Sequence, residues 1–208
     1  MGENESNVPF LDSNSSARKF RTHQRTSGAN TVEEYTYVTA EPPLATYTIS
    51  FASTVLSTAN SHPLQIMAGA SLRVHLRRLV LYQSANAAAN TPVVFELRRL
   101  TTAGTGGSGL VPAPMDTADA VAGATAMVLP SSKGTEGVLV GGRHRGTILA
   151  NASTANLQPI LDLDWARERT KGPIIAAGTS LGLALKNIST DASVQIEGYA
   201  EIVEATTA

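Results

Sequence analysis

Cysteine is absent from the 208-residue sequence, which excludes disulfides and thiolate metal sites as sources of stability. Charge is scarce as well, because charged residues make up 16% of the chain, against roughly 25% in an average soluble domain. Sixteen Lys and Arg oppose 17 Asp and Glu, so no overall field attracts nucleic acid or an anionic membrane. Small neutral residues take the place of charge. Such a surface is typical of a protein partly covered in an assembly, although a protein with many glycine-rich loops has a similar composition.

Long apolar runs and targeting signals are also missing. No apolar run approaches the roughly 18 residues that a membrane-spanning helix needs. The start of the chain, MGENESNVPF, has neither the basic nor the apolar region of a secretory signal peptide. We therefore expect no membrane partner.

Residues 1–31 differ from the remainder, 32–208, because they contain few aliphatic residues and many Ser and Asn. Such a segment buries too little apolar surface to offset the entropy lost on ordering it. It is either a solvated tail or an extended N-terminal arm that orders on a neighbouring protein chain, and nucleic acid is the less favoured partner. We expect the arm to bind through four basic and three apolar side chains, namely Phe10, Leu11, Arg18, Lys19, Phe20, Arg21 and Arg25.

From Val32 onward apolar and polar residues alternate, as they do in half-buried β-strands. Within residues 71–84 the alternation slips by one position at Arg78, which predicts a β-bulge. No segment keeps a 3.6-residue period for three turns. The expected strands lie within 32–38, 45–53, 64–67, 71–84, 91–100, 124–129, 146–150, 159–164, 173–176, 181–186 and 193–203. Short strands separated by Gly, Pro and Asn turns predict an all-β fold, an antiparallel β-sandwich of jelly-roll type.

The segment Gly178-Thr179-Ser180-Leu181-Gly182 matches the G-x-S-x-G pattern of a nucleophile elbow. An elbow requires a helix after the serine and a histidine later in the chain. Instead Leu183 and Leu185 continue an alternating, strand-like pattern, and all four histidines precede Ser180. We interpret Ser180 as a turn residue, and we expect no catalytic residue in the chain.

Three other groups of residues could carry chemistry. Asp162 and Asp164 are spaced to share Ca²⁺ or to act as an acid and base, but a largely basic run at 167–171 follows and favours local ion pairs. His144 lies in the glycine-rich GGRHRG and is expected in a solvated loop. Residues 104–109, GTGGSG, lack the Lys-Ser/Thr of a phosphate-binding loop. The sequence therefore predicts no cofactor and no metal site.

Two passages, residues 94–130 and 173–204, resemble a known class of proteins in their layout. The first is a strand ending in Arg98-Arg99, a Gly/Thr/Pro loop and an Ala-rich return strand; the second is a turn, a leucine-alternating strand and a closing strand that ends in Glu-Ile-Val-Glu. This layout resembles the small single-jelly-roll virion proteins of tailed bacteriophages, which are capsid decoration, head-fibre or tail-associated components and are commonly trimeric. The resemblance covers residues 45–204.

The resemblance implies a non-enzymatic structural protein of the virion. Its expected partners are further copies of itself in a homotrimer and the major capsid protein or another virion protein. Three alternatives remain open. The chain could be a phage tail or receptor-binding component, or a lectin-like carbohydrate-binding module that uses Trp165 and Tyr82. It could also be a cupin-type enzyme, which requires a histidine-rich metal set, to which His75 alone contributes.

Overall fold

The computed structural model describes residues 5–11, 17–27, 30–36, 44–56, 59–85, 87, 89–150, 159–167, 171–189 and 195–206. The chain divides into two compact units, Met1–Pro43 and Leu44–Ala208, and each is described by itself. The first unit runs past the boundary expected at residue 31. No helix that could cross a membrane occurs in the described ranges.

The first unit contains one antiparallel sheet in the order β1-β2-β3, formed by β1 (Glu5–Leu11), β2 (Ala17–Ser27) and β3 (Asn30–Thr36). The sequence showed no strand period before Val32, so β1 and β2 were not expected. Backbone hydrogen bonds join these strands, and such bonds form whatever the side chains are. An alternation of apolar and polar residues arises only where one face of a sheet is buried, so its absence does not exclude strands. Pro9 lies in the edge strand β1, where its missing N–H interrupts no inner ladder.

The second unit is an antiparallel β-sandwich, which confirms the all-β prediction; its described residues contain no helix. We name its two layers after a central strand of each: the β6 sheet has the order β12-β6-β15-β4-β9, with β13 also paired to β6, and the β7 sheet has the order β11-β7-β14-β5-β10-β8. The strands are β4 (Thr46–Val55), β5 (Leu64–Met67), β6 (Arg73–Gln83), β7 (Thr91–Leu100), β8 (Ser108–Leu110), β9 (Ala113–Pro114), β10 (Thr125–Val128), β11 (Glu136–Ile148), β12 (Leu161–Asp164), β13 (Ile174–Ile175), β14 (Gly182–Asn187) and β15 (Gln195–Ala205).

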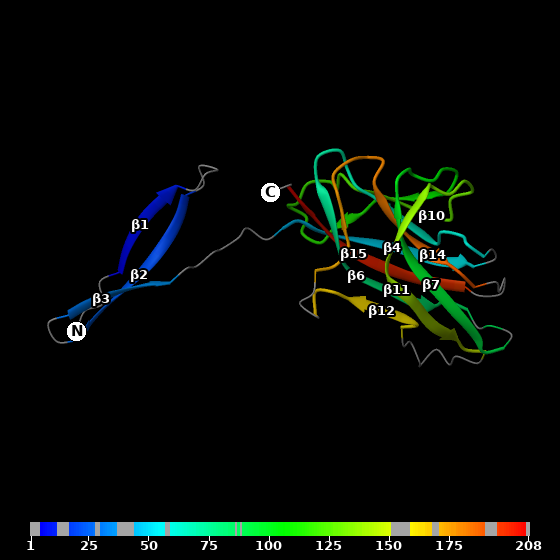
Figure 1. Cartoon of the computed structure of the whole chain (residues 1–208), viewed down its shortest axis with the longest axis horizontal. Helices are drawn as coiled ribbons and strands as arrows, with labels where there is room; N and C mark the ends of the chain where they lie inside the picture. The colour runs from blue at the N-terminus through cyan, green and yellow to red at the C-terminus, as the bar shows by residue number, and fades with distance from the viewer. Residues whose placement is uncertain are drawn as a thin grey trace. The chain divides into compact units, whose positions relative to one another are not determined.

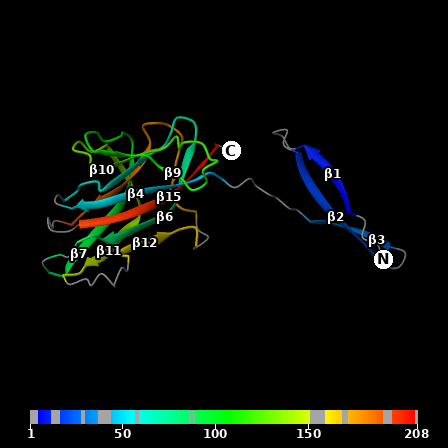
Figure 2. The same ribbon diagram turned by 180° about the vertical axis from the view of Figure 1, so that it is seen from behind.

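The two sheets face each other, with β11 against β12 at one side and with β8 and β10 against β4 at the other. Figure 1 shows the two layers, and Figure 2 shows β4, β15, β6 and β12 running side by side. Between β4 and β7, and again between β11 and β12, consecutive strands belong to opposite sheets. Segments distant in sequence therefore become neighbours, as the pairing of β4 with β15 illustrates.

The core fills the space between the sheets and follows the predicted alternation. Leu183 and Leu185 of β14 are each only 2% exposed and belong to the core, which confirms their predicted orientation. On β6, Leu76 and Leu79 are both buried although they are three residues apart. The pairing with β15 shifts at this point, from Glu201 opposite Arg78 to Ile202 opposite Leu76. The predicted slip at Arg78 is thus confirmed as a bulge.

Strand β11 differs most from the sequence prediction. Only its end, within residues 146–150, was expected, yet the strand spans Glu136–Ile148. Its pairing with β7 shifts register twice, between Glu136 and Leu139 and between Val140 and Arg143, and Gly141 within the second shift has a φ of 76°. These irregularities and its exposed position at the sheet edge remove the alternation on which the prediction relied. His144 is consequently half-buried in a strand, and its assignment to a solvated loop was wrong.

Candidate functional site

The predicted partner-binding residues lie on β1 and β2 of the first unit. Phe10 pairs with Arg18, Lys19 pairs with Pro9, and Phe20 pairs with Val8. The remaining three occupy the same ladder, and their register pairs are Leu11 with Ala17, Arg21 with Asn7 and Thr36, and Arg25 with Val32. The backbone thus brings all seven into one sheet. Their side chains lie outside what the structure describes, so the binding role stays a prediction.

Ser180 is exposed and lies in a turn between β13 and β14. The Leu181 N–H donates to the Gly178 carbonyl at 3.0 Å, and Gly178 has a φ of 137°, a conformation that favours glycine. Strand β14 begins two residues later at Gly182. The predicted strand is therefore confirmed where a nucleophile elbow would need a helix.

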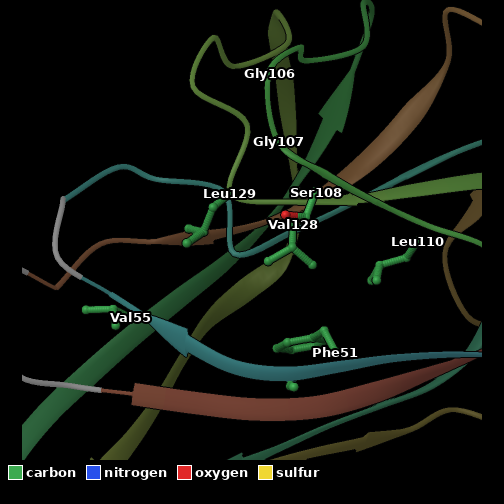
Figure 3. A pocket seen from close by; sticks show the side chains of 9 residues that line it. Phe51, Val55, Gly106, Gly107, Ser108, Leu110, Val128 and Leu129 are labelled. Atoms are coloured by element: carbon green, nitrogen blue, oxygen red, sulfur yellow. The ribbon is translucent and has the colours of Figure 1, made fainter.

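Each open side of the sandwich holds a pocket. At the side where β8 and β10 face β4, an apolar groove of about 540 Å³ has Phe51 as its buried floor. Figure 3 shows Val128 and Phe51 in the space between the strands, with Val55, Leu129 and Leu110 around it. The remaining lining residues are small, namely Ala52, Gly106, Gly107 and Ser108. None of the described residues that line the groove is charged.

The opposite side, where β11 faces β12, holds a larger and chemically different pocket of about 620 Å³. Its apolar wall consists of Val140, Leu163 and Trp165, which are partly buried and pack against the core. The remaining lining residues are Arg99, Gly141, His144, Lys171, Gly172, Pro173 and Ile174. Three of them, Arg99, His144 and Lys171, have basic side chains. We call this the cationic pocket, because none of its described lining residues is a carboxylate.

Arg99 enters this pocket from the inner face of the β7 sheet. It pairs with Leu183 of β14, and residues opposite each other in a ladder share a face, so Arg99 lies on the core side. It follows the buried inner-face residues Phe95 and Leu97 at the same spacing of two. Its guanidinium donates to the Ile174 carbonyl of the other sheet, which holds the side chain across the open side.

Lys171 and His144 complete the basic lining. Lys171 is exposed, and neither it nor Arg99 has an ion-pair partner within the described ranges. His144 is half-buried, and this burial lowers its pKa below the usual 6.5, so its imidazole is mainly neutral at pH 7. The pocket is therefore lined by two basic side chains, Arg99 and Lys171, and by one imidazole that gains a positive charge in acid.

Asp162 and Asp164 do form ion pairs, but not with the basic run that follows them. Arg78 of β6 donates to both oxygens of Asp162, at 3.1 and 2.9 Å, and its Nε lies 3.8 Å from Asp164. Asp164 also accepts the Arg167 N–H at 2.8 Å. The prediction that these carboxylates form ion pairs holds, but the predicted local partners were wrong among the described residues, because the cross-strand register places Arg78 opposite Asp164. Arg169, one of the predicted partners, lies outside the described residues.

A buried polar network on the outer face of the β7 sheet was not foreseen. His62 is 0% exposed; its Nε2 lies 3.0 Å from Glu136 Oε1 and its Nδ1 lies 2.6 Å from Gln65 Nε2. The Gly104 N–H donates to Gln65 Oε1 at 3.0 Å, so the amide nitrogen of Gln65 faces His62 and donates to Nδ1. His62 is thereby assigned as the neutral tautomer with its proton on Nε2.

The protonation of this network follows from its burial. Burial lowers the pKa of His62 and outweighs the opposite effect of Glu136. Glu136 itself is desolvated, but hydrogen bonds from Lys186 at 2.7 Å and from His62 lower its pKa below 4.5. The network ties the residues before β5 to the loop at Gly104 and to the start of β11. Its role is to fix these loops on the sheet.

Glu96 is a second buried carboxylate on this outer face, with 1% of its side chain exposed. Arg143 and Arg98 donate to its two oxygens, each at 2.8 Å. Burial alone would raise the pKa of Glu96, but hydrogen bonds and charge attraction from the two arginines outweigh it and lower the pKa below 4.5. This network stabilises the edge pairing of β11 with β7.

The segment between β8 and β10 exposes apolar side chains. Val111 is 78% exposed, Met115 64% and Val121 80%. Glu204 of β15 anchors the end of this segment by accepting the Gly123 and Ala124 N–H groups at 3.1 and 2.6 Å. These three side chains are available for contact with another molecule, which would remove apolar surface from water.

The cupin-type alternative would need several histidines on adjacent strands. His62 precedes β5 and is engaged with Gln65 and Glu136, while His75 lies on β6 and His144 on β11. No group of three or more His, Cys, Asp or Glu side chains gathers within the described part of the chain. These donor positions do not fit the cupin metal set.

The chain matches no protein-family model, and comparisons with curated proteins and with solved structures find no significant match.

Trp165 was a candidate binding residue from the sequence, whereas Arg99 and Lys171 were not recognised as parts of a ligand pocket. One signal was present in the sequence: Arg99 occupies the next inner-face position after Phe95 and Leu97, where a core strand would carry an apolar residue. Nothing in the sequence indicated that β13 and β12 would lie opposite this position.

Proposed function

We propose that the second unit is a single jelly roll. The observation that supports this proposal is the order of the strands in its two sheets. Numbered one to eight along the chain, β4, β5, β6, β7, β11, β12, β14 and β15 give the orders 1-8-3-6 in one sheet and 2-7-4-5 in the other. These orders support the proposal because they interleave two Greek keys, the arrangement of a jelly roll. Strands β8, β9 and β10 form an insertion between the fourth and fifth of these strands and extend both sheets.

We propose further that the chain is a non-enzymatic structural protein of a tailed-phage virion, a capsid decoration protein that assembles as a homotrimer. Jelly rolls of this kind build viral capsid and lectin domains as well as cupins, and the residue layout resembles virion proteins of that class. Low charge and the exposed Val111, Met115 and Val121 support an assembly, because covering these side chains removes apolar surface from water. The seven predicted arm residues would contact the major capsid protein or a neighbouring virion protein.

Light scattering on the purified chain tests the assembly. The wild type should have the mass of a trimer at micromolar concentration, and replacing Val111 and Val121 by Asp should give monomers with unchanged circular dichroism. Val138→Asp is the matched control, because Val138 is 71% exposed but lies on β11 at the other side of the sandwich. A monomeric wild type would contradict the trimer.

The virion assignment needs a separate measurement. Antibody raised against the purified chain should label intact phage particles in electron micrographs, and added protein should bind capsids. Deleting residues 2–31 should weaken that binding by about tenfold, which is roughly 1.4 kcal/mol, and rising salt should weaken it through screening. Equal binding of full-length and truncated protein at matched salt would refute the arm, and binding to neither capsids nor tails would refute the virion role.

A further inference from the structure

The cationic pocket between β11 and β12 is unexplained by a structural role. A sandwich that only packs against neighbours would end its inner face in apolar side chains, yet here Arg99 stands at that position and reaches across to Ile174. Arg99 and Lys171 both line this pocket without a carboxylate partner in the described ranges, and an anion bound between them would compensate both charges. The charge therefore indicates a negatively charged ligand.

Arg99 is suited to a carboxylate in particular. A guanidinium has five N–H donors in a fixed fork that matches two carboxylate oxygens. Among the described residues the only side-chain hydrogen bond of Arg99 goes to the Ile174 carbonyl, which orients the guanidinium and leaves further N–H donors for a ligand. Lys171, which is exposed at the rim, adds a flexible charge.

The apolar wall of the pocket indicates which uncharged groups a ligand should carry. Trp165 lines the pocket together with Leu163 and Val140, so an aromatic ring and aliphatic groups share the lining with the basic side chains. The volume of about 620 Å³ falls within the roughly 300–1,000 Å³ of pockets for organic ligands. Inorganic phosphate or sulfate would leave most of this space and the whole apolar wall unused. A pyranose ring offers an apolar C–H face to an indole and polar hydroxyls to its surroundings.

We propose that this pocket binds an acidic sugar, with the pyranose ring against Trp165 and the sugar carboxylate between Arg99 and Lys171. The ligand class is a glycan that contains uronic acid residues. The site goes beyond a structural role, and it does not depend on whether the chain belongs to a virion.

Isothermal titration of the full-length chain tests the proposal with three matched probes. Tri-galacturonate carries ring and carboxylates, its methyl ester keeps the rings without the charge, and inorganic phosphate supplies the charge without the rings. We expect tri-galacturonate to bind in the micromolar to millimolar range, and the ester and phosphate to bind at least tenfold more weakly. If the methyl ester binds as tightly as tri-galacturonate, the carboxylates do not contribute to binding. If phosphate binds as tightly, the pocket is a general anion site. Either result overturns the proposal.

Variants locate the binding in the pocket. Lys171→Met removes an exposed charge and Trp165→Leu removes the ring, and each should weaken tri-galacturonate binding about tenfold or more. Arg145→Met is the control, because Arg145 is exposed on β11 and does not line the pocket; it should bind as the wild type does. Thermal melting verifies that each variant is folded. Undetectable binding of tri-galacturonate to the wild type would refute the site. So would an unchanged affinity in folded Lys171→Met, and so would an affinity lost in Arg145→Met as well.

Discussion

Replacing both arginines that pair with Glu96 should destabilise the sandwich much more than replacing either one. The Arg143 side chain is 59% exposed and that of Arg98 is 28% exposed. A partly exposed partner contributes about 0–1 kcal/mol, and after a single Arg→Ala change the other arginine still compensates the carboxylate. The double change leaves Glu96, which is 1% exposed, as an unpaired charge.

The magnitude follows from this burial. Leaving one member of a buried ion pair uncompensated costs about 3–5 kcal/mol. For a chain of this size each kcal/mol shifts the Tm by about 2–4 °C, so the double variant should melt roughly 6–20 °C lower than the wild type. Glu96→Gln added to the double variant should recover more than half of the loss, because an amide is far less costly to bury than a carboxylate.

The sign of the pH dependence gives a second measurement. In the wild type the lowered pKa of Glu96 adds stability above its usual value near 4.5, and this stability is lost as the pH falls. Without the arginines only burial acts on Glu96, which raises its pKa, so the double variant should lose stability as the pH rises. Urea unfolding followed by circular dichroism, with the Glu96→Gln triple variant as reference, measures both effects. A loss equal to the sum of the single changes, without recovery by Gln, would refute the reasoning.

Four further outcomes follow from the fold. Leu183→Asp should unfold the sandwich, since loss of a buried leucine and burial of a charge together cost more than about 3 kcal/mol, whereas Ser180→Ala in the adjacent exposed turn should leave the melting temperature and any fluorophosphonate labelling unchanged. Far-ultraviolet circular dichroism should show a strand minimum, and dominant helical minima would contradict the two-sheet structure. The free energy of unfolding, measured with urea, should decrease as the pH is lowered from about 7 to about 5. Burial lowers the pKa of His62 and His144 below 6.5, so in this range the unfolded chain binds more protons than the native one.

The sequence predicted those parts of the fold in which one face of a strand is buried. The alternation around Leu183, the slip at Arg78 and the strand nature of residues after Ser180 all follow from side-chain burial, which the sequence expresses directly. Of the edge strands, β12 was expected within 159–164, whereas β8, β9 and most of β11 were missed. Most of β11 is exposed, and β8 and β9 have three and two residues, so neither burial nor length marks them in the sequence.

The polar sites could be predicted less well, because they depend on contacts between segments distant in sequence. His62 and Glu136 are separated by 74 positions, and Arg78 and Asp162 by 84. Only the sheet order brings them together, and local spacing carries no information about it. Asp162 therefore suggested pairing with its sequence neighbours, although the cross-strand partner was the one that formed.

The edges of the sandwich limit how copies of this chain can assemble. An exposed edge strand invites pairing with another edge unless it is short, bulged or charged. Strands β8 and β9 are short, and β11 carries two register shifts together with the exposed Arg143 and Arg145. These features disfavour continuous sheet pairing between copies. Contacts within the proposed trimer would then rest on side chains, and the exposed Val111, Met115 and Val121 lie beside the shortest edge strand, β9. The edge that is protected from strand addition is thus the one that offers apolar surface for assembly.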